Sequence, residues 1–139
     1  MNIKQKQKEV ADSMPKARGI YVAVPIGERL RPFDKDPRRN SALINENFVK
    51  VGKANNFKQR CRKYVADNDG DITFEVAVIT DHLTLDQHKA FENLLKVHFN
   101  EWRIRNPSGR KTEWMTGIDP VLVKSEIIRL FEEYENNLK

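Results

Sequence analysis

The chain has 139 residues, with 25 Lys or Arg against 20 Asp or Glu, so its formal net charge is +5 at pH 7. This length favours one domain with a modest core, and the positive balance favours an anionic partner over a basic surface without one. The single cysteine, Cys61, excludes an internal disulfide and fits a reducing compartment. No stretch approaches the roughly 20 apolar residues of a membrane span, and residues 1–14 lack the apolar segment of a signal peptide. We therefore expect an intracellular, cytoplasmic protein, with residues 1–17 as a lead-in and residues 18–139 as one domain.

The first predicted element is a strand over residues 18–24, which are β-branched and aromatic. Alternation places Ile20 on the face opposite Tyr21. Residues 25–47 then form a long polar connection rich in Pro and Arg, and connections of this length are usually functional or mobile. A second strand over residues 48–51 is expected to lie antiparallel to the first.

A basic helix follows the second strand. Residues 49–64 contain six Lys or Arg and no acidic residue. A pair of asparagines ending at Asn56 offers side-chain oxygens that cap a helix. Arg60 and Tyr64 lie four residues apart and share one helical face, while Cys61 can turn toward the core. A strand, a glycine and a cationic helix at this spacing suit a phosphodiester held close to the backbone.

The second half of the chain predicts one more strand and two helices. Residues 72–79 alternate, so that the even-numbered residues, including Val78, share one face. A Thr-Gln capping box opens the next helix, and its apolar stripe includes His98, which we interpret as a packed histidine. Residues 103–115 read as a basic turn followed by a short extended piece, and residues 120–137 as an amphipathic closing helix. The predicted fold is α/β (α+β), a three-stranded antiparallel sheet flanked by helices.

Two tripeptides stand in matching positions on the first two predicted strands. Residues 19–21 read Gly-Ile-Tyr and residues 50–52 read Lys-Val-Gly. With these motifs, residues 18–116 resemble a GIY-YIG nuclease, and most of all the branch found in phages and mobile elements, whose second motif reads KIG or KVG. Lys50 stands where the family usually has its second tyrosine. The Glu-Trp pair at residues 113–114 also matches this branch, although the resemblance assigns Glu113 no role.

The resemblance implies a catalytic set and a reaction. Arg60 matches the catalytic arginine of the family, Tyr64 the position four residues later, and Glu92 the metal-binding glutamate. The implied activity is a metal-dependent DNA endonuclease, in which Glu92 holds one Mg²⁺ or Mn²⁺ ion and Arg60 binds the scissile phosphate. Tyr21 would orient or deprotonate the attacking water. Lys50 would favour the tyrosinate by its charge, and Tyr64 would join the same hydrogen-bond network.

DNA is the expected partner, and binding is assigned to cations of the basic helix and of the long connection, which we interpret as a DNA-contacting insertion. These cations are Lys53, Lys58, Arg62, Lys63, Arg29, Arg31, Arg38 and Arg39. One alternative is a nucleic-acid-binding module of the same fold that has lost turnover. Another is a protein-interaction domain whose basic face is incidental.

Overall fold

The computed structural model describes residues 2–32, 41–105 and 109–139. In chain order its elements are α1 (Ile3–Ser13), β1 (Gly19–Pro25), β2 (Arg29–Pro32), β3 (Ser41–Ile44), β4 (Phe48–Ala54), α2 (Phe57–Asp67), β5 (Ile72–Ile79), α3 (Leu85–His98), the 3-10 turn η1 (Asn100–Trp102), β6 (Arg103–Arg105), β7 (Lys111–Thr116) and α4 (Pro120–Asn137). Five strands form one antiparallel sheet in the order β5-β1-β4-β7-β6, and β2 and β3 form a separate hairpin. No described helix is long and apolar enough to cross a bilayer.

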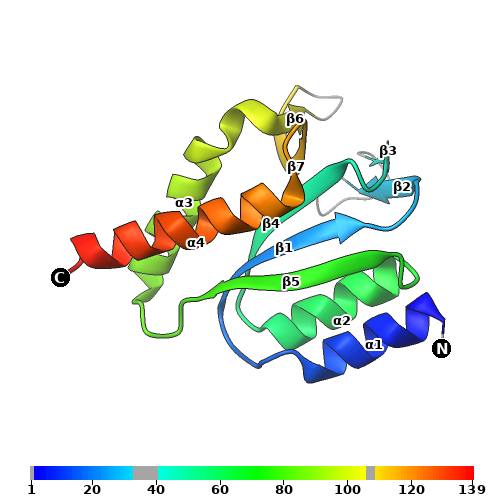
Figure 1. The fold of residues 1–139 in the computed structure, drawn as a ribbon, viewed down its shortest axis with the longest axis horizontal. Helices are drawn as coiled ribbons and strands as arrows, with labels where there is room; N and C mark the ends of the chain where they lie inside the picture. The colour runs from blue at the N-terminus through cyan, green and yellow to red at the C-terminus, as the bar shows by residue number, and fades with distance from the viewer. Residues whose placement is uncertain (1, 33–40, 106–108) are drawn as a thin grey trace.

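Helices cover both faces of the sheet, which makes three layers (Figure 1). α1 and α2 lie on one face, and α3 and α4 lie on the other. Alternation along β1 divides the core as the sequence predicted, because Ile20 packs with α3 and α4 whereas Tyr21 packs with α1 and α2. Ala11 of α1 is also buried on the face that α2 covers, so part of the predicted lead-in belongs to the packed domain.

The central strand pair depends on two glycines. β1 and β4 are antiparallel, as predicted, and Tyr21 lies opposite Gly52. A Cβ atom on Gly52 would lie 2.3 Å from the Tyr21 hydroxyl oxygen, and one on Gly19 would lie 2.1 Å from the Val78 carbonyl oxygen. Both positions therefore exclude a side chain because neighbouring atoms occupy its space. At Gly52 this close approach allows the ring of Tyr21 to lie across β4.

The prediction of a three-stranded sheet is wrong, because β6 and β7 extend the sheet to five strands. β7 pairs with β4 from Phe48–Thr116 to Lys50–Trp114, and β6 pairs with β7. Both added strands are short and rich in charged residues. β6 is only three residues long, and in β7 the apolar residues Trp114 and Met115 are adjacent, so neither shows the sustained alternation of apolar and polar residues that identifies a strand in a sequence.

The prediction that Val78 shares a face with the earlier even-numbered residues of β5 is also wrong. The register between β1 and β5 shifts at Ile20 and Tyr21, which lie opposite Val78 and Val76, so that Ala77 is the extra residue. Such a bulge moves all later side chains to the other face. Val78 consequently packs against α3 and α4, whereas Phe74 packs against α2.

The packed histidine of α3 is His88 rather than His98. His98 forms an ion pair of 3.2 Å with Glu126 and its side chain is 35% exposed. His88 is 1% exposed, and its Nδ1 atom lies 2.8 Å from the Thr80 hydroxyl oxygen. Burial, followed by the nearby charge of Arg18, lowers the pKa of His88. The amphipathic face of α3 is therefore turned relative to the predicted stripe.

The long connection is partly regular, since its described residues contain the β2–β3 hairpin. Arg31 fixes this hairpin to the C-terminal end of α2. Its Nε atom donates to Asn68 Oδ1 at 2.9 Å, and its two Nη atoms donate to backbone carbonyls of Gly27, Ile44 and Asp71. An arginine that satisfies carbonyls beside a helix C-terminus also complements the helix dipole. Residues 33–40 lie outside the described part.

Candidate active site

The sheet opens between β4 and β7, and this opening forms the site. β4 stays paired with β1 as far as Ala54, but its ladder with β7 ends at Lys50–Trp114. Beyond that pair, a cavity of about 30 Å³ reaches the core. This volume holds roughly two water molecules. Its lining residues are Ile20, Val51, Gly52, Glu92, Leu95, Lys96, Phe99, Arg103, Glu113 and Met115.

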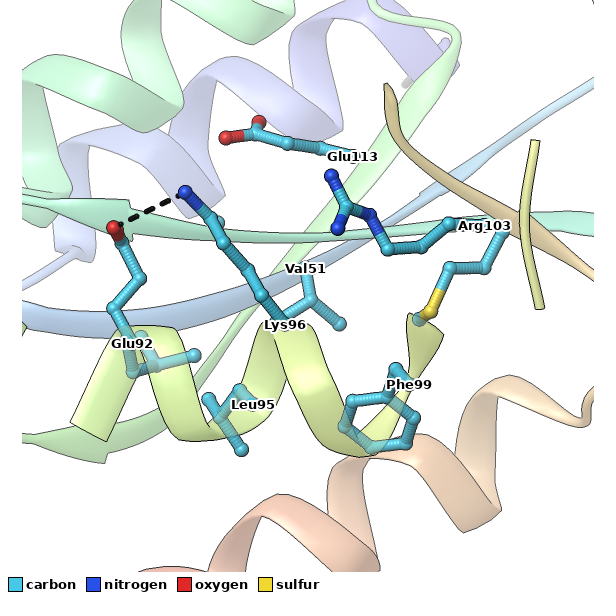
Figure 2. Close-up of a pocket in the computed structure, with 10 residues that line it drawn as sticks. Val51, Glu92, Leu95, Lys96, Phe99, Arg103 and Glu113 are labelled. Carbon is cyan, nitrogen blue, oxygen red and sulfur yellow. Dashed lines mark ion pairs between the residues drawn. The ribbon is translucent and has the colours of Figure 1, made fainter. Parts of the chain in front are cut away.

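Figure 2 shows how the cavity combines an apolar floor with a charged rim. Val51, Leu95 and Phe99 lie at its base, while the charged groups of the rim come from α3, β6 and β7. Glu92 and Lys96 lie one turn apart on α3, and the carboxylate of Glu113 lies across from them. An apolar floor strengthens the interactions of the charges above it, because it excludes water from one side.

A buried pair of tyrosines lies on the other face of the same strands. The hydroxyl oxygens of Tyr21 and Tyr64 are 2.8 Å apart, and the ring of Phe74 stacks on Tyr21 with centroids at 4.7 Å. Burial raises the pKa of Tyr21 well above its usual value, and the proximity of Tyr64 raises it further, whereas Lys50 lowers it. Burial likewise raises the pKa of Tyr64. Both phenols are therefore protonated at neutral pH.

This result corrects the prediction of a tyrosinate at Tyr21. Lys50 acts in the predicted direction, but burial has the larger effect. A protonated phenol can donate a hydrogen bond, and it is a poor base at pH 7. The pair can thus orient an oxygen or stabilise its charge, provided that one hydroxyl turns toward that oxygen.

Lys50 connects the tyrosine pair with the cavity. Its ammonium lies 4.9 Å from the ring centroid of Tyr64 and 5.7 Å from that of Trp114. The same ammonium is 3.6 Å from a carboxylate oxygen of Glu113, and the lysine side chain is 14% exposed. A partly enclosed cation that faces two rings and one carboxylate is held in place by attraction from several sides.

Glu92 is the most enclosed carboxylate of the cavity. Its side chain is 13% exposed, and its Oε1 atom lies 3.7 Å from Lys53 Nζ and 3.4 Å from Lys96 Nζ. Among the described residues no group of three His, Cys, Asp or Glu could hold a metal ion. Magnesium commonly takes one or two carboxylates and completes its shell with water and phosphate. Glu92 can supply the single carboxylate of such a site.

Arg60 lies on the exposed side of α2, one turn before Tyr64. Asn56 caps this helix through a hydrogen bond from Gln59 N to its side-chain oxygen, as the sequence predicted. Within the described part of the chain, no carboxylate forms an ion pair with Arg60. Its charge opposes the burial effect on the pKa of Tyr64, which indicates that the guanidinium is near the tyrosine pair.

The cations predicted to bind DNA fall into distinct structural settings. Lys58 and Lys63 on α2 form no ion pair with any residue that the structure describes. Lys53 pairs with Glu92, and Arg62 pairs with Asp12 of α1 at 3.0 Å. Lys63 is exposed and Lys58 is half-buried, and neither has to break an ion pair within the described residues in order to meet a phosphate.

The arginines of the hairpin require a correction. Arg31 is 1% exposed and all three guanidinium nitrogens donate to protein oxygens, so it cannot contact DNA as predicted. Arg29 is partly exposed, donates to the Asn68 carbonyl and lies 3.7 Å from a carboxylate oxygen of Asp71. Arg38 and Arg39 lie outside the described residues.

Sequence reasoning did not identify Arg103 as part of the site and left the role of Glu113 open. Arg103 lines the cavity while its Nε atom donates to the Thr112 carbonyl at 2.7 Å. The residues around Arg103 in the sequence predicted only a basic turn. Glu113 was visible as half of a Glu-Trp pair, but its approach to Lys50 depends on a strand pairing that the sequence did not predict.

These features define a mixed α+β domain with an antiparallel sheet and a charged cavity at an opening between two strands. The chain belongs to the T5orf172 domain family, whose family description matches residues 20–133. T5orf172 domains are found in proteins of phages and mobile elements, often nuclease-like or DNA-binding proteins. No curated protein and no solved structure matches the chain.

The family assignment to the GIY-YIG nucleases is wrong. The match to the T5orf172 domain, a different family, covers most of the chain, and the sheet has five strands rather than three. Each tripeptide also has a local physical reason. Gly19 and Gly52 lie where a Cβ atom would collide with Val78 or Tyr21. The glycines of these motifs therefore follow from the packing of a strand pair and do not by themselves identify a family.

Proposed function

We propose that this protein is a metal-dependent DNA endonuclease that hydrolyses phosphodiester bonds at the cavity between β4 and β7. The observation that supports it best is the setting of Glu92, an enclosed carboxylate on a cavity rim that is otherwise mostly cationic. Such a rim suits a phosphate, and a carboxylate among the cations suits a metal ion that accompanies the phosphate. Membership of a family often found in nuclease-like proteins agrees with this proposal.

Glu92 would hold one Mg²⁺ or Mn²⁺ ion, in exchange for its contacts with Lys53 and Lys96. The bound ion would stabilise negative charge on the phosphoryl oxygens. The two displaced ammonium groups would then lie beside the phosphate and help to balance its charge. Both lysine side chains are 45% exposed, so they can move toward a substrate without leaving a packed position.

The other residues of the set would bind and orient the substrate. Arg60 offers a planar fork of donors to the scissile phosphate, and its lack of an ion pair within the described residues leaves that fork available. Tyr21 and Tyr64, both protonated, would donate hydrogen bonds to an oxygen of the substrate or of the attacking water. Lys50 would hold Tyr64 in place through its contact with the ring.

DNA would lie along the cations of α2 and reach the cavity from that side. Lys58 and Lys63 would contact phosphates without regard to sequence, and Arg62 would do so after release from Asp12. The buried, unpaired Cys61 and a DNA substrate together favour an intracellular place of action.

A DNA-binding module without turnover is the second candidate. The observation that favours it is the pairing of Glu92 with two lysines, because a carboxylate already balanced by cations has less affinity for a metal ion. In that case the exposed cations of α2 would still bind DNA.

The test is the conversion of supercoiled plasmid to nicked or linear DNA in Mg²⁺ or Mn²⁺, with EDTA as the metal-free control. Wild-type protein should cleave only with the metal, and Glu92→Gln should lose about 10³-fold or more in rate while binding DNA as tightly as before. Glu75→Gln removes a 60% exposed carboxylate from a surface ion pair and serves as the matched control. DNA binding without cleavage by the wild type would favour the second candidate, and wild-type rates in Glu92→Gln would overturn the metal assignment.

A further inference from the structure

The proposed reaction needs a group that takes a proton from the attacking water. The tyrosine hydroxyls do not suit this task, since both are buried and protonated at neutral pH. An ionised carboxylate accepts hydrogen bonds only, which makes it the suitable class of acceptor. Glu92 and Glu113 are the carboxylates among the described residues that line the cavity, and the proposed function uses Glu92 for the metal ion.

Glu113 has the geometry that such an acceptor requires. It lines the same cavity as Glu92, from β7 on the opposite side of the opening. The ammonium of Lys50 lies 3.6 Å from a carboxylate oxygen of Glu113. This contact orients the carboxylate and leaves it accessible to solvent. The side chain is 42% exposed, whereas that of Glu92 is 13% exposed. A proton taken up by Glu113 can therefore pass to solvent.

We propose that Glu113 is a catalytic residue that accepts the proton of the attacking water; this inference rests on the proposed function. The water oxygen forms a bond to phosphorus as one of its protons moves to a Glu113 carboxylate oxygen. The bond between phosphorus and the 3′ oxygen breaks, and that oxygen takes a proton from solvent. The products are a 5′-phosphate and a 3′-hydroxyl, and Glu113 then returns its proton to water.

Charged groups from every neighbouring element act on this carboxylate. Lys50 of β4 is its ion-pair partner, Arg103 of β6 lines the same cavity, and Lys96 and Glu92 of α3 lie across from it. The charges around the Glu113 carboxylate are therefore three cations and one further carboxylate. Binding of phosphate and metal near the cavity changes this balance, so activity has to be compared at saturating DNA and metal.

The experiment compares Glu113→Gln, Glu92→Gln and the surface control Glu75→Gln in single-turnover cleavage and in Mn²⁺ binding by calorimetry. Glu113→Gln should slow cleavage by about 10² to 10⁴-fold, the usual range for loss of a general base, and should retain Mn²⁺ affinity within about threefold. Glu92→Gln should lose both. Added formate should restore part of the rate to Glu113→Ala, because a small carboxylate can enter the space that the side chain leaves.

The outcomes separate the two proposals. Wild-type cleavage by Glu113→Gln beside an inactive Glu92→Gln would overturn the role of Glu113 and leave the proposed function in place. Loss of Mn²⁺ binding in Glu113→Gln would make Glu113 a metal ligand and overturn the proton-acceptor role. A wild-type protein that binds DNA and never cleaves it would remove the proposed function and, with it, this inference.

Discussion

Arg31 on the β2–β3 hairpin is 1% exposed and donates to four protein oxygens, whereas Arg60 on α2 is exposed and forms no ion pair within the described residues. Both arginines stand in basic stretches. Arg31 was predicted to bind DNA, and Arg60 was predicted to bind the scissile phosphate as a catalytic residue. The fold gives them different tasks. Arg31 satisfies the side chain that ends α2 and three backbone carbonyls outside that helix, whereas Arg60 offers its donors to solvent. A basic stretch of sequence therefore predicts a DNA-binding surface only when its side chains are known to be exposed.

The largest expected effect of this difference concerns stability at Arg31. Arg31→Met should remove all four donated hydrogen bonds and leave buried acceptors unsatisfied, at a cost of about 1–3 kcal/mol for each acceptor that water cannot reach. We expect the free energy of unfolding in urea to fall by at least about 3 kcal/mol. Arg29→Met, at a partly exposed neighbour, is the control and should cost less. Equal stability of the two variants would contradict the structural role of Arg31.

Arg60 should show the opposite behaviour. Arg60→Ala should slow single-turnover cleavage by about 10² to 10³-fold, because a donor to the developing charge is lost. Its unfolding free energy should stay within about 0.5 kcal/mol of wild type, since the side chain is exposed. Arg62→Ala, on the same helix and paired with Asp12, is the matched control and should cleave at nearly the wild-type rate at saturating DNA. A large stability loss in Arg60→Ala would remove the contrast with Arg31.

Burial also affects Cys61 on the inner side of α2, and this predicts how the stability of the protein depends on pH. Burial raises the pKa of the Cys61 thiol to about 11, from an ordinary value of 9.0. The unfolded chain therefore loses this proton first as pH rises, so the stability contribution is complete below pH 9 and is lost between pH 9 and pH 11. Two pKa units correspond to about 2 to 3 kcal/mol, an upper value for this thiol.

The measurement is the unfolding free energy in urea at intervals from pH 8 to pH 11. Cys61→Ala should lower stability at pH 8 and should weaken the decline with pH relative to wild type. Tyr21→Phe is a useful second variant. Burial raises the pKa of the Tyr21 phenol in the wild type, which adds a decline in stability that begins near pH 10, and this variant should lack that decline. An unchanged pH dependence in Cys61→Ala would contradict the buried, neutral thiol.

The smallest effects should come from the unpaired lysines of α2. Lys58→Gln and Lys63→Gln should each weaken DNA binding modestly and reduce the slope of log affinity against log salt by about one unit. Lys124→Gln, whose lysine pairs with Glu75 of β5, is the control and should leave the slope unchanged. Binding that does not depend on salt would support a protein partner rather than DNA.

The sequence predicted the elements whose residues follow one clear period. The strand at β1, its antiparallel neighbour β4, the cap at Asn56 and the closing helix α4 all agree with the structure. Each is specified by neighbouring residues, through alternation, a capping side chain or an amphipathic repeat. Their agreement shows how much of this fold is encoded locally.

The features that escaped prediction depend on distant partners. The bulge that turns Val78 to the other face follows from its register with Ile20, and β6 and β7 become strands only by pairing with β4 and with each other. The burial of Arg31 needs acceptors from Asn68 and Asp71, which are far away along the chain. The approach of Glu113 to Lys50 likewise depends on the pairing of β4 with β7.

Hydrolysis at the cavity is the central claim, and isotope transfer from water tests it most directly. An end-labelled duplex incubated with wild-type protein and Mg²⁺ in H₂¹⁸O should yield 5′-phosphate ends that each carry one ¹⁸O atom, as measured by mass spectrometry. Glu92→Gln should yield no labelled ends under the same conditions. DNA that is bound but remains intact, or ends that form without ¹⁸O, would contradict phosphodiester hydrolysis by this protein.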